Sequence, residues 1–284
     1  MDNMKNFFYS NWAYLIWGAV YMFLTWIVFC FSVTQLEAIV LTIVIYAVSI
    51  GIALSPAGEI FLRFSLGARK PATREEIDYL APIFEEVYQS ALEENSSLNK
   101  DIQVYIDNSM IPNAYAVGRK TVAVTMGALQ TFSQDELKGV LAHELGHISH
   151  GDTKTLLLNN IGNGFFGILI FFTNIGIRIF QFLIAVLSRY WWINIIFNIL
   201  VWIANLYILV FQLIGDLILS LNSRQSEYFA DKFAYQIGYG EDLTSALYLL
   251  QKTEIPANVP ILERLRSSHP HTAKRIQRLE NMEF

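Results

Sequence analysis

Uncharged and charged stretches alternate along this chain of 284 residues. Four stretches are uncharged or nearly so, and they cover about residues 12–33, 38–54, 156–187 and 191–221. A helix needs about 20 apolar residues to cross a bilayer, and each stretch approaches or exceeds that length. The pattern therefore predicts a polytopic membrane protein with about four membrane segments, arranged as two hairpins.

The first predicted hairpin occupies residues 1–55. Only Thr34–Glu37 separates its two apolar stretches, which is typical of a short turn between helices. A cleaved signal peptide is the alternative for the first stretch, but that stretch exceeds the roughly 7–15 residue core of such peptides, and no A-x-A-like cleavage site follows it. Basic residues lie at Lys5 and within residues 63–74 but not in the turn, so both ends of the hairpin should face the cytoplasm.

The second predicted hairpin, residues 156–221, is less apolar. Asparagines recur in both of its stretches, and polar residues inside a membrane usually face other helices or a wet cavity. The aromatic segment Tyr190–Trp192 at its turn is typical of an anchor at the membrane surface. Arg189 would lie on the outer side if both helices cross, which the preference of basic residues for the cytoplasmic side disfavours. A crossing hairpin and one lying partly in the interface both stay open.

The remaining segments, residues 56–155 and 222–284, are polar. Together they hold roughly 160 residues, enough for one compact domain. We therefore expect a single cytoplasmic domain whose two parts are separated by the second hairpin.

The composition supports a membrane protein and excludes some partners. Hydrophobic residues make up 54% of the chain and charged residues 16%, which is too apolar for an ordinary soluble domain. The net charge is −5 and the basic residues form no long run, so we expect the lipid bilayer, and not nucleic acid, as a partner. The single cysteine, Cys30, excludes an intramolecular disulfide.

One short segment carries the candidate chemistry. Ser133 and Glu136 have the S-x-x-E spacing of a capping box, which predicts that a helix begins there. The buried stripe of this helix should be Leu137, Val140, Leu141 and Leu145. His143 and His147 are four residues apart and so lie on one face, where they can bind one metal ion, with Glu144 beside the water that the ion would hold. This H-E-x-x-H pattern predicts a zinc metallopeptidase; two histidines on a surface helix are the alternative.

A catalytic zinc ion needs a third protein ligand and an open position for water. His150 lies on the same face of the helix, but a single rigid helix surrounds an ion poorly, so a distant carboxylate is preferred. Glu227 and Asp231 follow the fourth apolar stretch at a spacing of four, so one can ligate the ion while the other orients an imidazole. Arg224 falls on the same face and could neutralise these carboxylates. Two apolar stretches separate the two motifs, so two crossings would return the chain to the same side.

At these residues the chain resembles the HtpX-type membrane zinc metalloproteases, relatives of the prenyl-protein (CaaX) endopeptidases. The resemblance extends over nearly the whole chain, from the first hairpin to the E-x-x-x-D motif. It implies a mainly α-helical, zincin-like metalloprotease domain with a small β edge. It also implies one Zn²⁺ ion bound by His143, His147 and Glu227, with Glu144 as the catalytic residue and Asp231 orienting a ligand.

Two further segments match the family. Asn113 opens an N-A-x-A-x-G segment, and the resemblance implies that it contacts the substrate backbone; a loop asparagine after a proline is the alternative. His269 belongs to an H-P element and would stabilise the oxyanion, with Arg275 as structural support. From the residues alone, a solvated histidine before a proline is the simpler interpretation of His269.

The segment Thr121–Met126 alternates with a period of two after a Gly118–Lys120 turn, which predicts an edge strand that could pair with an extended substrate. Such pairing recognises backbone, so broad specificity is expected.

The predicted function is a multi-pass endopeptidase of a bacterial inner membrane, with its catalytic domain in the cytoplasm, that cleaves misfolded or damaged membrane proteins. Two alternatives stay open: a prenyl-protein endopeptidase, and a non-enzymatic channel or scaffold with structural histidines. The sequence leaves the oligomeric state undetermined.

Overall fold

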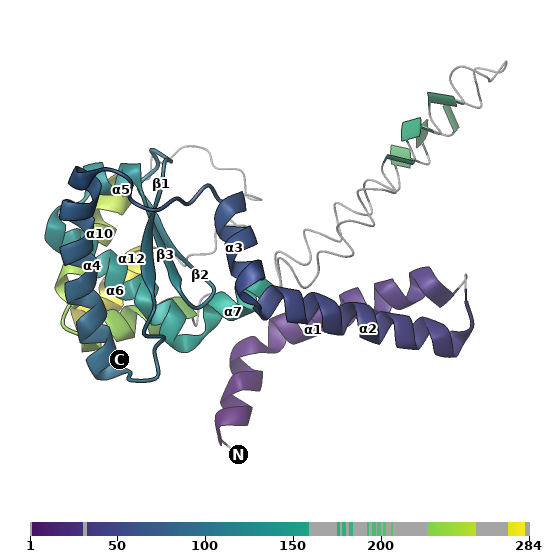
Figure 1. Ribbon diagram of the computed structural model, residues 1–284, viewed down its shortest axis with the longest axis horizontal. Helices are drawn as coiled ribbons and strands as arrows, with labels where there is room; N and C mark the ends of the chain where they lie inside the picture. Colours follow the sequence, from purple (N-terminus) through teal and green to yellow (C-terminus); the bar gives the residue numbers. More distant parts are fainter. Residues whose placement is uncertain are drawn as a thin grey trace.

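The computed structural model describes residues 2–30, 33–158, 226–253 and 272–281, together with short pieces between residues 175 and 206. An elongated helical hairpin extends from a rounded body in which helices surround a small sheet (Figure 1). The second predicted hairpin lies almost entirely outside the described residues, and so do Arg224 and His269.

The hairpin consists of α1 (Asp2–Cys30) and α2 (Gln35–Leu54). The side chain of Thr34 accepts a hydrogen bond from the Glu37 N–H, and the Glu37 carboxylate accepts one from the Thr34 N–H, so this capping box begins α2. The predicted turn over these residues is therefore largely the first turn of a helix.

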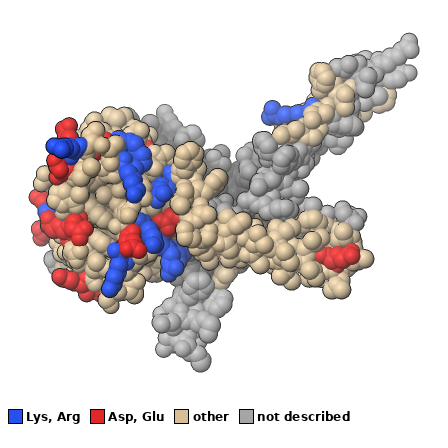
Figure 2. Space-filling model, viewed as in Figure 1, with Lys and Arg blue, Asp and Glu red and all other residues tan. Residues whose placement is uncertain are grey.

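Only α2, among the described helices, is long and apolar enough to cross a membrane; α1 contributes the shorter apolar stretch Leu15–Ile27. On the face that Figure 2 shows, the surface of α2 is uncharged except for acidic atoms at its far end, whereas both charge signs gather on the body. One of the four predicted membrane segments is thus clearly present and a second is present in shorter form.

The chain enters the body through α3 (Pro56–Ser65), which follows α2 with one residue between them. Ser55 is both the last cap of α2 and the first cap of α3. Pro56 suits the first position of a helix, where its missing N–H costs no hydrogen bond. A second capping box, of Thr73 and Glu76, then begins α4 (Arg74–Glu94).

The sheet contains β1 (Gln103–Asp107), β2 (Ala114–Val117) and β3 (Thr121–Thr125) in the order β1-β3-β2. β3 pairs in parallel with β1 and antiparallel with β2. The prediction that Thr121–Met126 forms an edge strand is therefore wrong: β3 is central and β2 is an edge strand. Both threonines of β3 are buried, and their hydroxyl groups form hydrogen bonds inside the protein. The alternation of polar and apolar residues in this strand therefore does not indicate a solvent-facing side.

Helices pack against the sheet and against one another. They are α5 (Met126–Thr131), α6 (Gln134–His150), α7 (Asp152–Leu157), an unlabelled helix over residues 226–236, α10 (Gly240–Thr253) and α12 (Thr272–Asn281).

The predicted capping box of Ser133 and Glu136 does begin α6. The predicted stripe on α6 is buried and forms part of one hydrophobic core with residues of α4, the sheet, α10 and α12. Gly139 of α6 lies against the backbone of Leu243 in α10, where a larger residue would collide. α6 therefore lies at the centre of the body, with α4 and α10 packed against it.

Candidate active site

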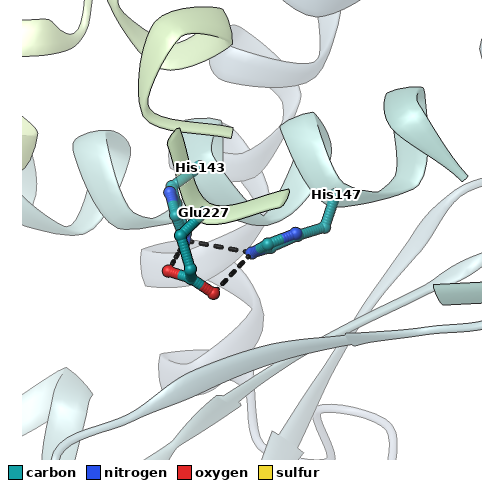
Figure 3. Close-up of side chains that lie close together, drawn as sticks. All are labelled: His143, His147 and Glu227. Atoms are coloured by element: carbon teal, nitrogen blue, oxygen red, sulfur yellow. Dashed lines mark hydrogen bonds and ion pairs between the residues drawn. The ribbon is translucent and has the colours of Figure 1, made fainter. Parts of the chain in front are cut away.

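His143 and His147 come from one face of α6, one helical turn apart. Their Nε2 atoms lie 3.1 Å from each other, and their rings meet edge to face. Figure 3 shows both imidazoles reaching toward a common point. The four-residue spacing thus brings the two imidazoles together on one face of α6, as the sequence predicted.

Glu227 reaches the same point from the helix over residues 226–236 (Figure 3). One carboxylate oxygen lies 3.4 Å from His143 Nε2, and the other lies 3.4 Å from His147 Nε2. The prediction that Glu227 completes the metal site is confirmed, since these three residues offer ligand atoms within 4.8 Å of one another.

The three ligand atoms fit a zinc ion. Bonds of roughly 2.0–2.2 Å in a tetrahedron place neighbouring ligand atoms about 3.3 Å apart. The two Nε2 atoms lie 3.1 Å apart, and each of the two Glu227 oxygens lies 3.4 Å from one of them. Two imidazoles and one carboxylate are also a donor set of catalytic zinc sites, which leaves the fourth position for water or substrate.

A glycine allows the second helix to approach. A Cβ atom at Gly146 would lie 2.9 Å from the Ala230 Cα, which is closer than packed side chains allow. Gly146 occupies one of the two variable positions of H-E-x-x-H, and Ala230 is itself small and completely buried. This contact brings Glu227 within reach of both histidines.

Asp231 contacts His143. Its Oδ1 lies 2.9 Å from His143 Nδ1, so the imidazole keeps Nε2 for the metal. Arg275 of α12 donates to both oxygens of this carboxylate, and its Nη1 lies 3.2 Å from Glu227. Burial opposes ionisation of Asp231, but the adjacent Arg275 charge and His143 outweigh burial and lower the pKa of Asp231. The contact expected between Asp231 and an imidazole is present.

Asp152 has the equivalent contact with His147, and the sequence analysis missed it. Its Oδ2 lies 3.1 Å from His147 Nδ1. Burial opposes ionisation, yet hydrogen bonds from His147 and His150 outweigh it and lower the pKa of Asp152 to about 2. The available signal was Gly151, which ends α6 with a φ of 90° and turns the chain back toward the histidine.

His150 is not part of the metal site. Its Nδ1 lies 2.7 Å from Asp152 Oδ1, and its ring stacks on Phe229 with the centroids 4.2 Å apart. The choice of a distant carboxylate over His150 as third ligand was therefore correct.

The carboxylates around the metal site affect the protonation of the histidines. Burial lowers the pKa of His147, but hydrogen bonds to Asp152 and Glu227 raise it well above its ordinary value. For His143, burial and the Arg275 charge act downward, hydrogen bonds to Asp231 and Glu227 act upward, and the net pKa is raised. Because only a neutral imidazole can ligate a metal, a raised histidine pKa makes protons compete with zinc at this site.

Of the other predicted site residues, the structure describes Glu144 and Asn113. Glu144 follows His143 on α6 and is only 6% exposed. Among the described residues, no lysine or arginine forms an ion pair with it. Asn113 is exposed and directly precedes β2; its N–H donates to the Thr125 hydroxyl. The roles of Glu144 and Asn113 stay predictions, as do those of Arg224 and His269.

Comparison with known proteins gives one family. Residues 78–283 match the profile described as peptidase family M48. A protease HtpX homolog of Bacillus licheniformis is 34% identical over 202 residues, which cover 65% of this chain and 65% of that protein. A protease HtpX homolog of Dictyoglomus turgidum is 30% identical over 251 residues, covering 81% of this chain and 77% of that protein. Among solved structures, the crystal structure of S. mikatae Ste24p matches with a TM-score of 0.48 and 21% identity, covering 98% of this chain and 65% of that chain.

Proposed function

This chain belongs to peptidase family M48, and we propose that it acts as a membrane-bound zinc endopeptidase. The observation that carries the proposal is the convergence of His143, His147 and Glu227 within 4.8 Å, with Glu144 buried beside them on α6. The polypeptide backbone is the substrate class that follows from membership in a peptidase family.

The residues of the site divide the work of peptide hydrolysis. A bound zinc ion lowers the pKa of water toward 7 and polarises a carbonyl group. Glu144 accepts the proton of the attacking water and returns it to the leaving amine, since its carboxylate is the acid–base group adjacent to the ligands. Asp231 and Asp152 each hold one imidazole by its Nδ1, so that both Nε2 atoms keep their direction through the reaction.

An extended substrate binds along β2. Among the described strands, β2 pairs only with β3, which leaves its outer edge without a partner strand there, and β2 packs against α6. Pairing of this kind recognises the substrate backbone, so cleavage has broad sequence specificity. Asn113 is exposed and directly precedes β2, which supports a contact between this residue and the same backbone.

The membrane setting is supported by α2, whose apolar residues are largely exposed, and by the shorter apolar stretch Leu15–Ile27 of α1. Residues 1–55 anchor the enzyme, residues 56–155 and 222–284 form the catalytic domain, and residues 156–221 form a second membrane hairpin. The basic residues that flank the hairpin support a catalytic domain on the cytoplasmic side of a bacterial membrane. Its substrates are misfolded or damaged membrane proteins, which present extended backbone close to the bilayer.

The test compares the full-length wild type with Glu144→Gln and Glu227→Ala, measuring zinc content and cleavage of an unfolded membrane protein. Glu144→Gln should keep zinc and lose activity by at least about 10²-fold, in the range expected for a lost acid–base group. Glu227→Ala should lose both zinc and activity. Glu85→Gln, an exposed carboxylate change on α4, should leave both unchanged. Cleavage that survives Glu144→Gln would contradict the proposal.

A further inference from the structure

A buried carboxylate connects the segment after the membrane hairpin to the turn between β2 and β3. Glu59 lies on α3 and is 8% exposed. Its Oε1 accepts hydrogen bonds from the Lys120 N–H at 3.0 Å and the Thr121 hydroxyl at 2.7 Å, and its Oε2 accepts one from the Arg119 N–H at 3.0 Å. All three donors belong to the turn between β2 and β3 or to the first residue of β3.

The turn is shaped around this carboxylate. Gly118 has a φ of +65°, a conformation that other residues rarely adopt. A Cβ atom there would also lie 2.5 Å from Glu59 Oε2. Glycine is thus required both by the backbone conformation and by the position of the carboxylate, which explains the last residue of the N-A-x-A-x-G segment.

A second element holds the turn from the other side. The hydroxyl of Thr153, a buried residue of α7, donates a short hydrogen bond to the Gly118 carbonyl. Thr153 directly follows Asp152, whose carboxylate holds His147. The turn therefore lies between α3, which follows the membrane hairpin, and the residue next to a partner of a metal ligand.

The connection to α2 is equally rigid. Gly58 lies against the end of α2, where a Cβ atom would come within 2.5 Å of the Ala53 carbonyl oxygen. Because α3 begins one residue after α2 ends, this close corner fixes the direction of α3 and hence the position of Glu59. Glu59 thus lies five residues after the last residue of α2.

The turn fixes one end of β2. Val117 pairs with Thr121 where the two strands meet the turn, and Thr121 is bound to Glu59. The other end is fixed at Asn113, which exchanges hydrogen bonds with Thr125. Of these two attachments, only the one through Glu59 originates from the segment that follows the membrane hairpin.

We propose that Glu59 is a positioning residue that holds β2 at the distance from α6 that an extended substrate requires, so that the membrane hairpin is part of the substrate-binding apparatus. This inference rests on the proposed function, because it assumes that substrate pairs with β2. The carboxylate touches neither substrate nor metal and acts through the turn.

The proposal makes a specific kinetic prediction. Displacement of β2 weakens backbone pairing equally in the ground state and the transition state, which raises KM and leaves kcat unchanged. Glu59→Gln keeps the shape of the side chain but places an amide N–H against at least one donor. We expect KM for an unstructured peptide to rise about tenfold, equivalent to about 1.4 kcal/mol, with kcat within about twofold and zinc content unchanged.

Three further variants of the full-length enzyme complete the test. Thr121→Val removes one of the three hydrogen bonds and should raise KM by a smaller factor, which keeps the test available if Glu59→Gln does not fold. Gly118→Ala adds a Cβ atom that would collide with the Glu59 carboxylate, so it should raise KM as Glu59→Gln does. Glu76→Gln is the matched control, since Glu76 also accepts hydrogen bonds from backbone N–H groups but lies on α4; it should lower the melting temperature without changing KM.

The outcomes separate this inference from the proposed function. An unchanged KM in folded Glu59→Gln and Thr121→Val, or a joint loss of kcat and zinc, would overturn the positioning role while the peptidase assignment stands. Absence of cleavage by the wild type, or equal cleavage by Glu144→Gln, would instead remove the proposed function itself.

Discussion

Two apolar helices, α6 and α2, have opposite surroundings. Leu137, Leu141 and Leu145 of α6 are completely buried, whereas Ile39 and Ile43 of α2 are 47% and 53% exposed. Other protein elements cover most of α6, whereas α2 is strongly apolar and few of its residues are buried. An apolar face that other elements cover stabilises the fold through packing, whereas an apolar helix that the protein leaves exposed is typical of a membrane span.

The largest expected effect distinguishes a helix that is buried in protein from a helix whose apolar residues are exposed. Leu141→Ala should destabilise the protein by about 2–5 kcal/mol, because it removes a buried side chain and leaves a cavity beneath the metal-binding helix. The matched change Ile43→Ala on α2 should alter the free energy of unfolding of the catalytic part by less than about 0.5 kcal/mol. Denaturant unfolding in detergent micelles, followed by loss of activity, measures both. Equal destabilisation by the two changes would show that α2 packs against protein.

A smaller effect is expected within the metal site, where packing and polar contacts can be separated. Asp152→Asn keeps the size of the side chain but weakens its hold on His147, so zinc affinity should fall about 10- to 100-fold. Competition with a chelator of known affinity measures this change. The melting temperature of the zinc-loaded protein should hardly move, and a large decrease would mean that Asp152 mainly supports the fold.

The smallest effect concerns a charge on the surface of the body. Hydrogen bonds from Arg69 and from the backbone of Ala72 and Thr73 outweigh desolvation and lower the pKa of Glu76 to about 2. The folded-state pKa is below the unfolded one, so Glu76 stabilises the fold above pH about 4.5 and loses this contribution as the pH falls toward 2. The difference in melting temperature between wild type and Glu76→Gln should therefore shrink between pH 6 and pH 3. A constant difference over this range would contradict the assignment.

The features that the sequence predicted correctly are local. The capping box at Ser133, the buried stripe of α6 and the pairing of His143 with His147 each depend on residues within two turns of one another. The match of Glu227 to this pair followed from chemistry, since a zinc site needs a third ligand. These interactions could be recognised because their geometry is set by the helix period.

The features that the sequence missed depend on where distant backbone lies. Asp152 reaches His147 only because Gly151 reverses the chain, and Glu59 binds a turn some 60 residues away. The position of β3 was mistaken for a related reason. Its threonines are polar in sequence. In the fold, the Glu59 carboxylate and the Ile111 carbonyl accept hydrogen bonds from their hydroxyl groups. No periodicity of residues 121–126 contains that information.

The network at the metal site also constrains the order of events during synthesis. Arg275, which holds Asp231 and contacts Glu227, lies 132 positions after His143. At about 5–20 residues per second, a ribosome needs about 7–26 s to reach it after the first histidine. Once Asp231 has been added, the nascent chain carries both histidines, Glu227 and Asp231 but still lacks Arg275. The contacts that Arg275 makes with Asp231 and Glu227 therefore form last among those described at the site.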